Sequence, residues 1–155
     1  MKTLLWALAV LASSVPAVTL DGTKAEMIPA AQVKAEIDST AVQAAADGHG
    51  TGVLARYGNL ALQVSVLTRS GEGEIHAHLD DLMIVQQGSA TLITGGTLVD
   101  RRELPNGSKG SGILNGKTQI LHVGDVVIIP AGVPHQLLIA PGMVYSSLVA
   151  KIKES

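Results

Sequence analysis

A succession of short β-prone runs, beginning near residue 59, constrains the fold of this 155-residue chain more than any other feature. The first run, LALQVSVL, places leucine or valine at every second position from Leu60 to Val66, which is the period expected of a strand. Six more runs follow: LMIVQQ, ATLIT, TQILHV, VVIIP, HQLLIA and MVYSSLVAKI. Clusters of Gly, Pro, Asn and Asp separate them, so the pattern predicts an antiparallel sandwich or barrel in one domain.

The first 17 residues, MKTLLWALAVLASSVPA, have the layout of a secretory signal peptide. Lys2 precedes an apolar stretch, and small residues lead to a cleavage point after Ala17. The apolar stretch is shorter than the roughly 20 residues that span a bilayer, and a buried N-terminal helix is the alternative. We therefore expect a periplasmic or secreted protein that has no membrane segment after cleavage.

Two further segments complete the predicted organisation. Residues 18–58 form a lead-in with a helix at about 29–46, where Pro29 suits a first helical position and Val33, Ile37 and Val42 fall roughly on one face. Residues 59–152 form the barrel. Within it, residues 95–117 contain six glycines and predict a long surface loop, with a lid or a short hairpin around residues 97–101 as alternatives.

Composition excludes several classes of protein. There is no cysteine, so a disulfide cannot stabilise the fold and a packed core or a metal must do so. Without the predicted signal peptide, which contains Lys2, the chain has 10 basic and 13 acidic residues, a formal charge of −3. It has no extended basic stretch and no set of aromatic residues on which bases would stack, so we expect no nucleic-acid partner.

Three histidines predict a metal site. On a strand, His76 and His78 would project to the same face with Cα atoms roughly 6.5 Å apart, close enough to share one ion at nitrogen–metal distances of about 2.1 Å. His135 follows the corner PAGVP, where Pro130, Gly132 and Pro134 restrict the backbone and set the direction of the next strand. It can supply the third imidazole from a separate strand.

These residues resemble the two motifs of the cupin superfamily over roughly residues 59–152. In the first motif, G(X)5HXH(X)3–4E(X)6G, the matching residues are Gly71, His76, His78 and Gly88. In the second, G(X)5PXG(X)2H(X)3N, they are Gly124, Pro130, Gly132 and His135.

The first motif departs from the family pattern in its spacing. Only four residues separate Gly71 from His76, and only two separate His78 from Asp81, which takes the place of the glutamate. In the second motif Ile139 replaces the asparagine. Asp81 is therefore a metal ligand, a hydrogen-bond partner of a ligand imidazole, or neither.

The resemblance implies an all-β fold, an antiparallel double-stranded β-helix or jelly-roll barrel, here with a short N-terminal helix. It implies a divalent transition metal bound by His76, His78 and His135, with Asp81 as the fourth candidate; Zn, Fe, Mn, Ni and Cu all remain open. Alternation along the strands predicts a largely apolar pocket. The predicted lining residues are Met83, Val85, Leu137 and Ile139, with Gln63 as a polar candidate.

Three functions are compatible with these features. The first is an exported single-domain cupin that holds a metal and a small organic ligand without turnover. The second is a metal-dependent enzyme acting on a small molecule by oxygenase-like or lyase-like chemistry; sugar isomerisation fits the apolar lining less well. The third is a metal-free structural or interaction protein. The resemblance also implies a homodimer.

Overall fold

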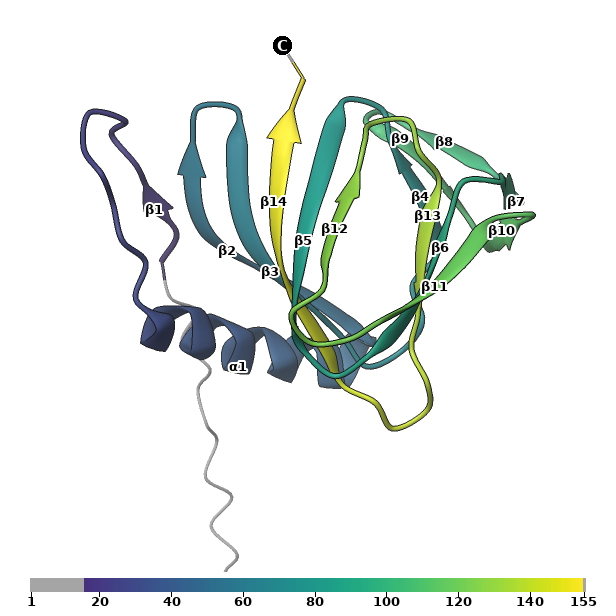
Figure 1. The fold of residues 1–155 in the computed structure, drawn as a ribbon, viewed down its shortest axis with the longest axis horizontal. Coiled ribbons are helices and arrows are strands. Elements are labelled where there is room, and N and C mark those ends of the chain that lie inside the picture. Colours follow the sequence, from purple (N-terminus) through teal and green to yellow (C-terminus); the bar gives the residue numbers. More distant parts are fainter. Residues whose placement is uncertain (1–15, 155) are drawn as a thin grey trace, which may run out of the picture.

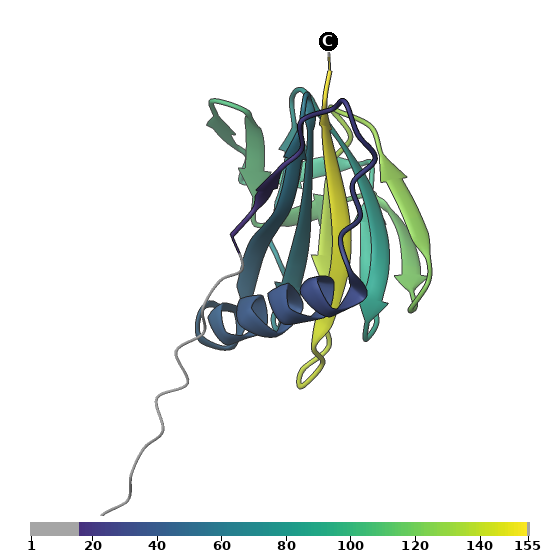
Figure 2. The same ribbon diagram turned by 90° about the vertical axis from the view of Figure 1, so that its left-hand side faces the viewer.

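The computed structural model describes residues 16–154, and the predicted signal peptide lies outside this part except for its last two residues. The described chain forms two facing sheets that curve around a common interior (Figure 1), with one helix across the outside of the first sheet (Figure 2). This is the predicted all-β jelly-roll architecture with a short helix. No helix of residues 16–154 has the length and apolar character needed to cross a membrane.

The first sheet contains six strands. Their order is β1 (Val18–Thr19), β2 (His49–Tyr57), β3 (Leu60–Leu67), β14 (Tyr145–Lys153), β5 (Leu79–Gln87) and β12 (Val126–Ile129). All neighbours are antiparallel except β1 and β2. Residues 49–57, which the sequence placed in the lead-in, thus form a full strand of the sheet.

The second sheet also contains six strands, and it faces the first across the interior. Their order is β11 (Lys117–Leu121), β6 (Ala90–Thr94), β13 (His135–Leu138), β4 (Gly73–His76), β9 (Gly107–Gly110) and β8 (Arg102–Leu104). A separate antiparallel pair joins β7 (Thr97–Val99) to β10 (Gly112–Leu114).

Residues 95–117 are not the predicted surface loop. They contain β7 to β10, and β9 pairs with β4 in the second sheet. The glycines in this segment permit close pairing: a Cβ on Gly107 would overlap the carbonyl of Ile75 on β4, and one on Gly110 would meet the carbonyl of Val99. The glycine content that predicted a loop therefore reflects tight packing between strands.

The helix, α1 (Ala30–Asp47), packs on β2 and β3 and ends at Gly48, whose φ of 87° is left-handed and whose N–H donates to the carbonyl of Ala44. Its buried side chains are Glu36, Thr40 and Ala44. Of the predicted apolar face, Val33 and Ile37 are partly buried, whereas Val42 is 57% exposed. The helix lies so close to β2 at Gly50 and Gly52 that a Cβ on either glycine would overlap Thr40 or Glu36.

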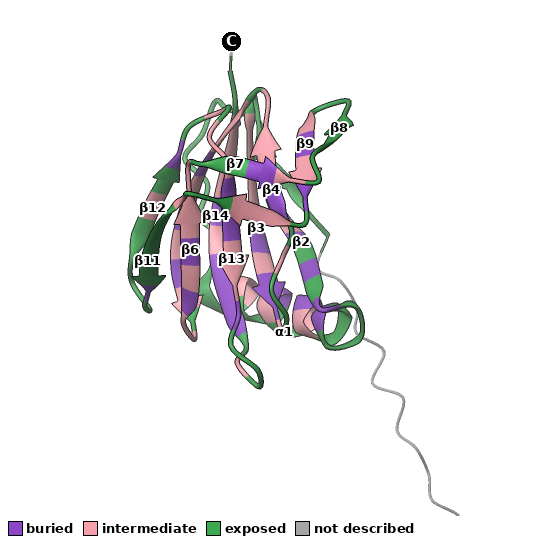
Figure 3. Ribbon diagram, turned by 90° about the vertical axis from the view of Figure 1, so that its right-hand side faces the viewer, coloured by how far each residue is buried: buried purple, intermediate pink, exposed green. Residues whose placement is uncertain are grey.

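The apolar core lies between the two sheets. Its buried members are Leu67, Met83, Val85, Ala90, Leu92, Leu121, Ile129, Ile139, Tyr145 and Val149. The burial colours in Figure 3 show the same pattern, with buried positions alternating along β6 and exposed positions along β11 and β12.

Candidate metal centre in the barrel

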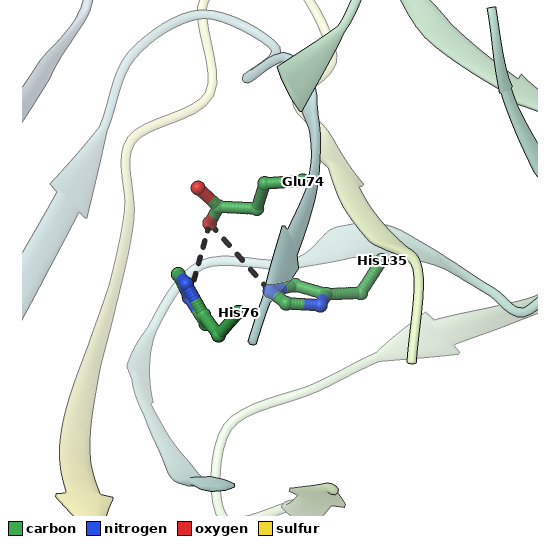
Figure 4. A group of neighbouring side chains, drawn as sticks. All are labelled: Glu74, His76 and His135. Carbon is green, nitrogen blue, oxygen red and sulfur yellow. Dashed lines mark ion pairs between the residues drawn. The ribbon is translucent and has the colours of Figure 1, made fainter. Parts of the chain in front are cut away.

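The centre of the site is a cluster of one carboxylate and two imidazoles. Among the described residues, Glu74, His76 and His135 bring one possible ligand atom each to within 4.8 Å of one another (Figure 4). Glu74 Oε1 lies 3.5 Å from His135 Nε2 and 3.8 Å from His76 Nε2. The two imidazole rings are 5.2 Å apart between centroids and tilted by 58°.

Strand register places these side chains. Glu74 on β4 lies directly opposite His135 on β13, and Lys109 on β9 lies opposite Glu74 on its other side. Directly paired residues on neighbouring strands project to the same face of a sheet, so these three side chains form one row. His76 lies two residues along β4 from Glu74 and shares that face.

The first sheet contributes a second row, which meets the first across the interior. Lys151 on β14 is paired in register with Asp81 on β5. The Lys151 ammonium donates to both Asp81 oxygens at 2.8 Å, and its Nζ lies 2.9 Å from His76 Nε2. Asp81 Oδ2 is in turn 3.3 Å from His76 Nε2 and 3.8 Å from His135 Nε2. Two carboxylates, two imidazoles and one ammonium thus meet where the sheets converge.

The corner before β13 delivers His135 as predicted. His135 is 5% exposed, and Gly132, with φ of 78°, donates its N–H to the carbonyl of His76 at 2.8 Å. This bond ties the corner to the end of β4. His135 Nδ1 lies 3.0 Å from the carbonyl of Val133. An N–H donated there leaves Nε2 as the nitrogen that faces the cluster.

His78 is not part of the cluster, so this predicted ligand is wrong. Strand β4 ends at His76, and the chain bends at Ala77 and His78 before β5 begins in the other sheet. The two-residue alternation on which the prediction relied therefore stops at His76. The His78 side chain is 72% exposed, and its Nδ1 lies 3.8 Å from Glu154.

Sequence reasoning missed Glu74, although the signal was present in the spacing. When Glu74 and His76 take the two histidine positions of the first cupin motif, four residues separate His76 from Asp81 and six separate Asp81 from Gly88. Both intervals then fit the motif. These two intervals favour Glu74 and His76 at the paired positions, whereas only two residues then separate Gly71 from Glu74.

The charges in the cluster favour ionised carboxylates. Burial alone raises the pKa of Glu74, but His135, then His76 and Lys109, lower it to about 2. Burial likewise raises the pKa of Asp81, and the contacts with His76 and Lys151 lower it overall. For His135, burial lowers the pKa, while Glu74 and the Val133 carbonyl raise it above the usual value. Both carboxylates are therefore negatively charged near neutral pH, which favours a cation beside them.

The distances fit a transition-metal ion. Bonds of about 2.1 Å in tetrahedral geometry place ligand atoms about 3.4 Å apart, close to the 3.5 and 3.8 Å measured from Glu74 to the two histidines. Asp81 lies outside this group of three, and Lys151 donates to both of its oxygens. For His76 Nε2 to bind an ion, the Lys151 ammonium has to turn away from it, while its contact with Asp81 can remain.

A cavity of about 640 Å³ opens beside the cluster, a size typical of small-molecule sites. Among the predicted lining residues, Gln63, Met83 and Leu137 line it. Val85 and Ile139 do not line the cavity, and both belong to the apolar core. The cavity is also more polar than predicted, since Lys151, Lys109 and other charged side chains contribute to it.

Comparison with known proteins supports the fold. The cupin domain of Schizosaccharomyces pombe Cnp3 matches 68% of this chain and 61% of its own with a TM-score of 0.51 at 12% identity. The chain has the cupin fold. The polyketide cyclase RemF from Streptomyces resistomycificus matches at a TM-score of 0.51 and 20% identity, over 68% of this chain and 66% of its own.

A third similar structure is Fe(II)-HppE with the alternative substrate (S)-1-HPP, which matches 68% of this chain and 50% of its own with a TM-score of 0.50 at 18% identity. This chain thus spans between half and two thirds of the length of these three cupin-fold structures. No protein-family model matches the sequence, and no curated protein matches it.

Proposed function

We propose that the protein binds one divalent transition-metal ion through Glu74, His76 and His135, and holds a small organic ligand next to it. The observation that carries the proposal is the register of β4 and β13, which sets a carboxylate and an imidazole side by side on an inward face. Two nitrogens and one oxygen form a donor set that suits Zn, Fe, Mn, Ni or Cu. An iron-containing cupin-fold neighbour supports this choice of chemistry.

Metal analysis of protein purified without an affinity tag tests the proposal. We expect about one ion per chain after loading with Zn²⁺ and gel filtration, as measured by inductively coupled plasma mass spectrometry. H135A should lose this stoichiometric metal. H122A is the matched control, because His122 is 72% exposed and lies outside the cluster. Retained metal in a folded H135A variant would overturn the assignment.

Catalysis is a second candidate, and the open side of the cluster favours it. Three protein ligands leave positions free on a bound ion, and the cavity lies beside them. A bound metal at such a site polarises a carbonyl or activates a small molecule. Oxygen uptake and product analysis across diketones, phenols and organic acids, with the metal-loaded protein, tests turnover. A panel without reaction would leave binding as the function.

The proposal also includes export, which rests on the sequence of residues 1–17. Expression of the full chain in a bacterial host, followed by osmotic release of the periplasm and intact-mass measurement, tests it. We expect a mature form that begins at Val18. Full-length protein confined to the cytoplasm would contradict export without bearing on the metal site.

A further inference from the structure

Two lysines from opposite sheets lie on either side of the metal centre. Lys151 lies on β14 and contacts His76 and Asp81, whereas Lys109 lies on β9 and is 3.6 Å from Glu74 Oε2. Both side chains line the cavity. Lys151 is 21% exposed and Lys109 is 41% exposed, so both ammonium groups have a side open to the interior or the rim.

The charge of the cavity changes sign when a divalent ion is bound. Three cationic side chains, Arg69, Lys109 and Lys151, and four acidic ones, Asp47, Glu72, Glu74 and Asp81, line it. With neutral histidines the formal lining charge is −1, and a divalent ion brings it to +1. Glu72 at the rim is already held by Arg102 at 2.6 Å, so it contributes little repulsion toward a ligand.

The rest of the lining suits an apolar body with a polar end. Leu67, Met83, Leu137 and Val149 present apolar surface to the cavity, and the volume of about 640 Å³ accommodates an aromatic ring. Gln136 donates to the carbonyl of Gly71, which fixes its amide at the cavity wall. A ligand with an anionic group at the metal position and an apolar body along these side chains would contact both the charged and the apolar part of the lining.

We propose that the ligand of this cavity is a small organic carboxylate, with its carboxylate between the metal position and the Lys151 and Lys109 ammonium groups. This inference rests on the metal site of the proposed function. Lys151 has a double role: two of its three N–H donors stay with the Asp81 carboxylate, and the third, which faces His76 in the metal-free protein, turns to the ligand anion when an ion binds beside His76. Paired ammonium groups discriminate an anion from a neutral molecule of the same shape.

Titration with benzoate, and with benzamide as its neutral counterpart, tests the proposal. Isothermal titration calorimetry is carried out on metal-free and Zn²⁺-loaded protein. We expect Zn²⁺-loaded protein to bind benzoate at least tenfold more tightly than benzamide. K151M should weaken benzoate binding at least tenfold, and K109M at least threefold. K34M, which removes the same charge from a lysine 76% exposed on α1, should stay within twofold of wild type.

One variant needs a companion, because K151M leaves the buried Asp81 carboxylate without its cation. The double variant D81N/K151M removes both charges, so no unpaired charge stays buried. It should fold and show the same loss of benzoate affinity as K151M. Equal affinity of wild type and D81N/K151M for benzoate, or equal affinity of wild type for benzoate and benzamide, would overturn the proposal.

The metal measurement separates the two proposals. If Zn²⁺ binds stoichiometrically but K151M and K109M bind benzoate as tightly as wild type, the carboxylate inference fails and the metal site stands. If Zn²⁺ does not bind, the proposed function fails, and benzoate titration of the metal-free protein decides the ligand class alone. If benzoate binding to the metal-free protein depends on the lysines, the carboxylate proposal is retained. If it does not, the carboxylate proposal is rejected.

Discussion

Replacing Lys151 with methionine perturbs the barrel where its two sheets meet. Asp81 is 3% exposed, and Lys151 supplies the only ammonium that the described residues place on its oxygens, at 2.8 Å each. Removing one partner of a buried ion pair costs about 3–5 kcal/mol, because the other charge remains buried. Lys151 is 21% exposed and His76 stays 3.3 Å from Asp81, so we expect the lower end, about 3 kcal/mol.

Urea and thermal unfolding of the metal-free protein, followed by circular dichroism, measure this loss. A change of about 3 kcal/mol lowers Tm by about 10 °C for a domain of this size. D81N/K151M should recover all but about 1 kcal/mol, since both charges are then absent. A double variant D81N/K151M that is no more stable than K151M would refute the assignment of Lys151 as the counter-ion of Asp81.

The same variant makes an opposite prediction for metal binding. K151M removes an ammonium 2.9 Å from His76 Nε2 and frees both Asp81 oxygens. We expect Zn²⁺ affinity to rise about tenfold, equivalent to about 1.4 kcal/mol. Competition with a chromophoric chelator measures it, and K34M again serves as the control. Weaker Zn²⁺ binding by K151M would show that Lys151 does not compete with the ion.

Three further outcomes are expected. H76A should lose stoichiometric Zn²⁺, whereas H78A should keep it, because the His78 side chain is 72% exposed and faces Glu154; mass spectrometry of loaded variants distinguishes the pair. In the metal-free protein, Glu74 has a pKa of about 2 instead of 4.5, so its stabilising contribution is present above pH 4.5 and is lost as the pH falls toward 2. Urea midpoints should therefore fall less steeply with decreasing pH in E74Q than in wild type, and parallel profiles would contradict this. Chelation should lower the Tm of the loaded protein, since free ion at 100 times Kd stabilises the fold by about 2.7 kcal/mol, and equal Tm values with and without chelator would argue against a site confined to the folded state.

The sequence predicted part of the site because some of its determinants are local. The corner from Pro130 to Pro134 restricts the backbone immediately before His135, so its inward direction follows from neighbouring residues. The prediction failed at His78 because the end of β4 is not a local property. The chain leaves one sheet for the other at Ala77. The alternation of side chains predicts which face of a sheet a residue occupies only within a continuous strand.

The sequence by itself determined that this chain folds as an all-β jelly roll, because alternating apolar runs can bury their surface only by packing sheet against sheet. It also predicted that His76 and His135 lie together, and the structure brings them into one cluster. Only the tertiary structure decided the partners of these histidines. Glu74, Lys109 and Lys151 acquire their positions from strand register, and Lys151 lies 70 residues from the Asp81 carboxylate that it neutralises. No local pattern specifies which residues of distant strands will face each other.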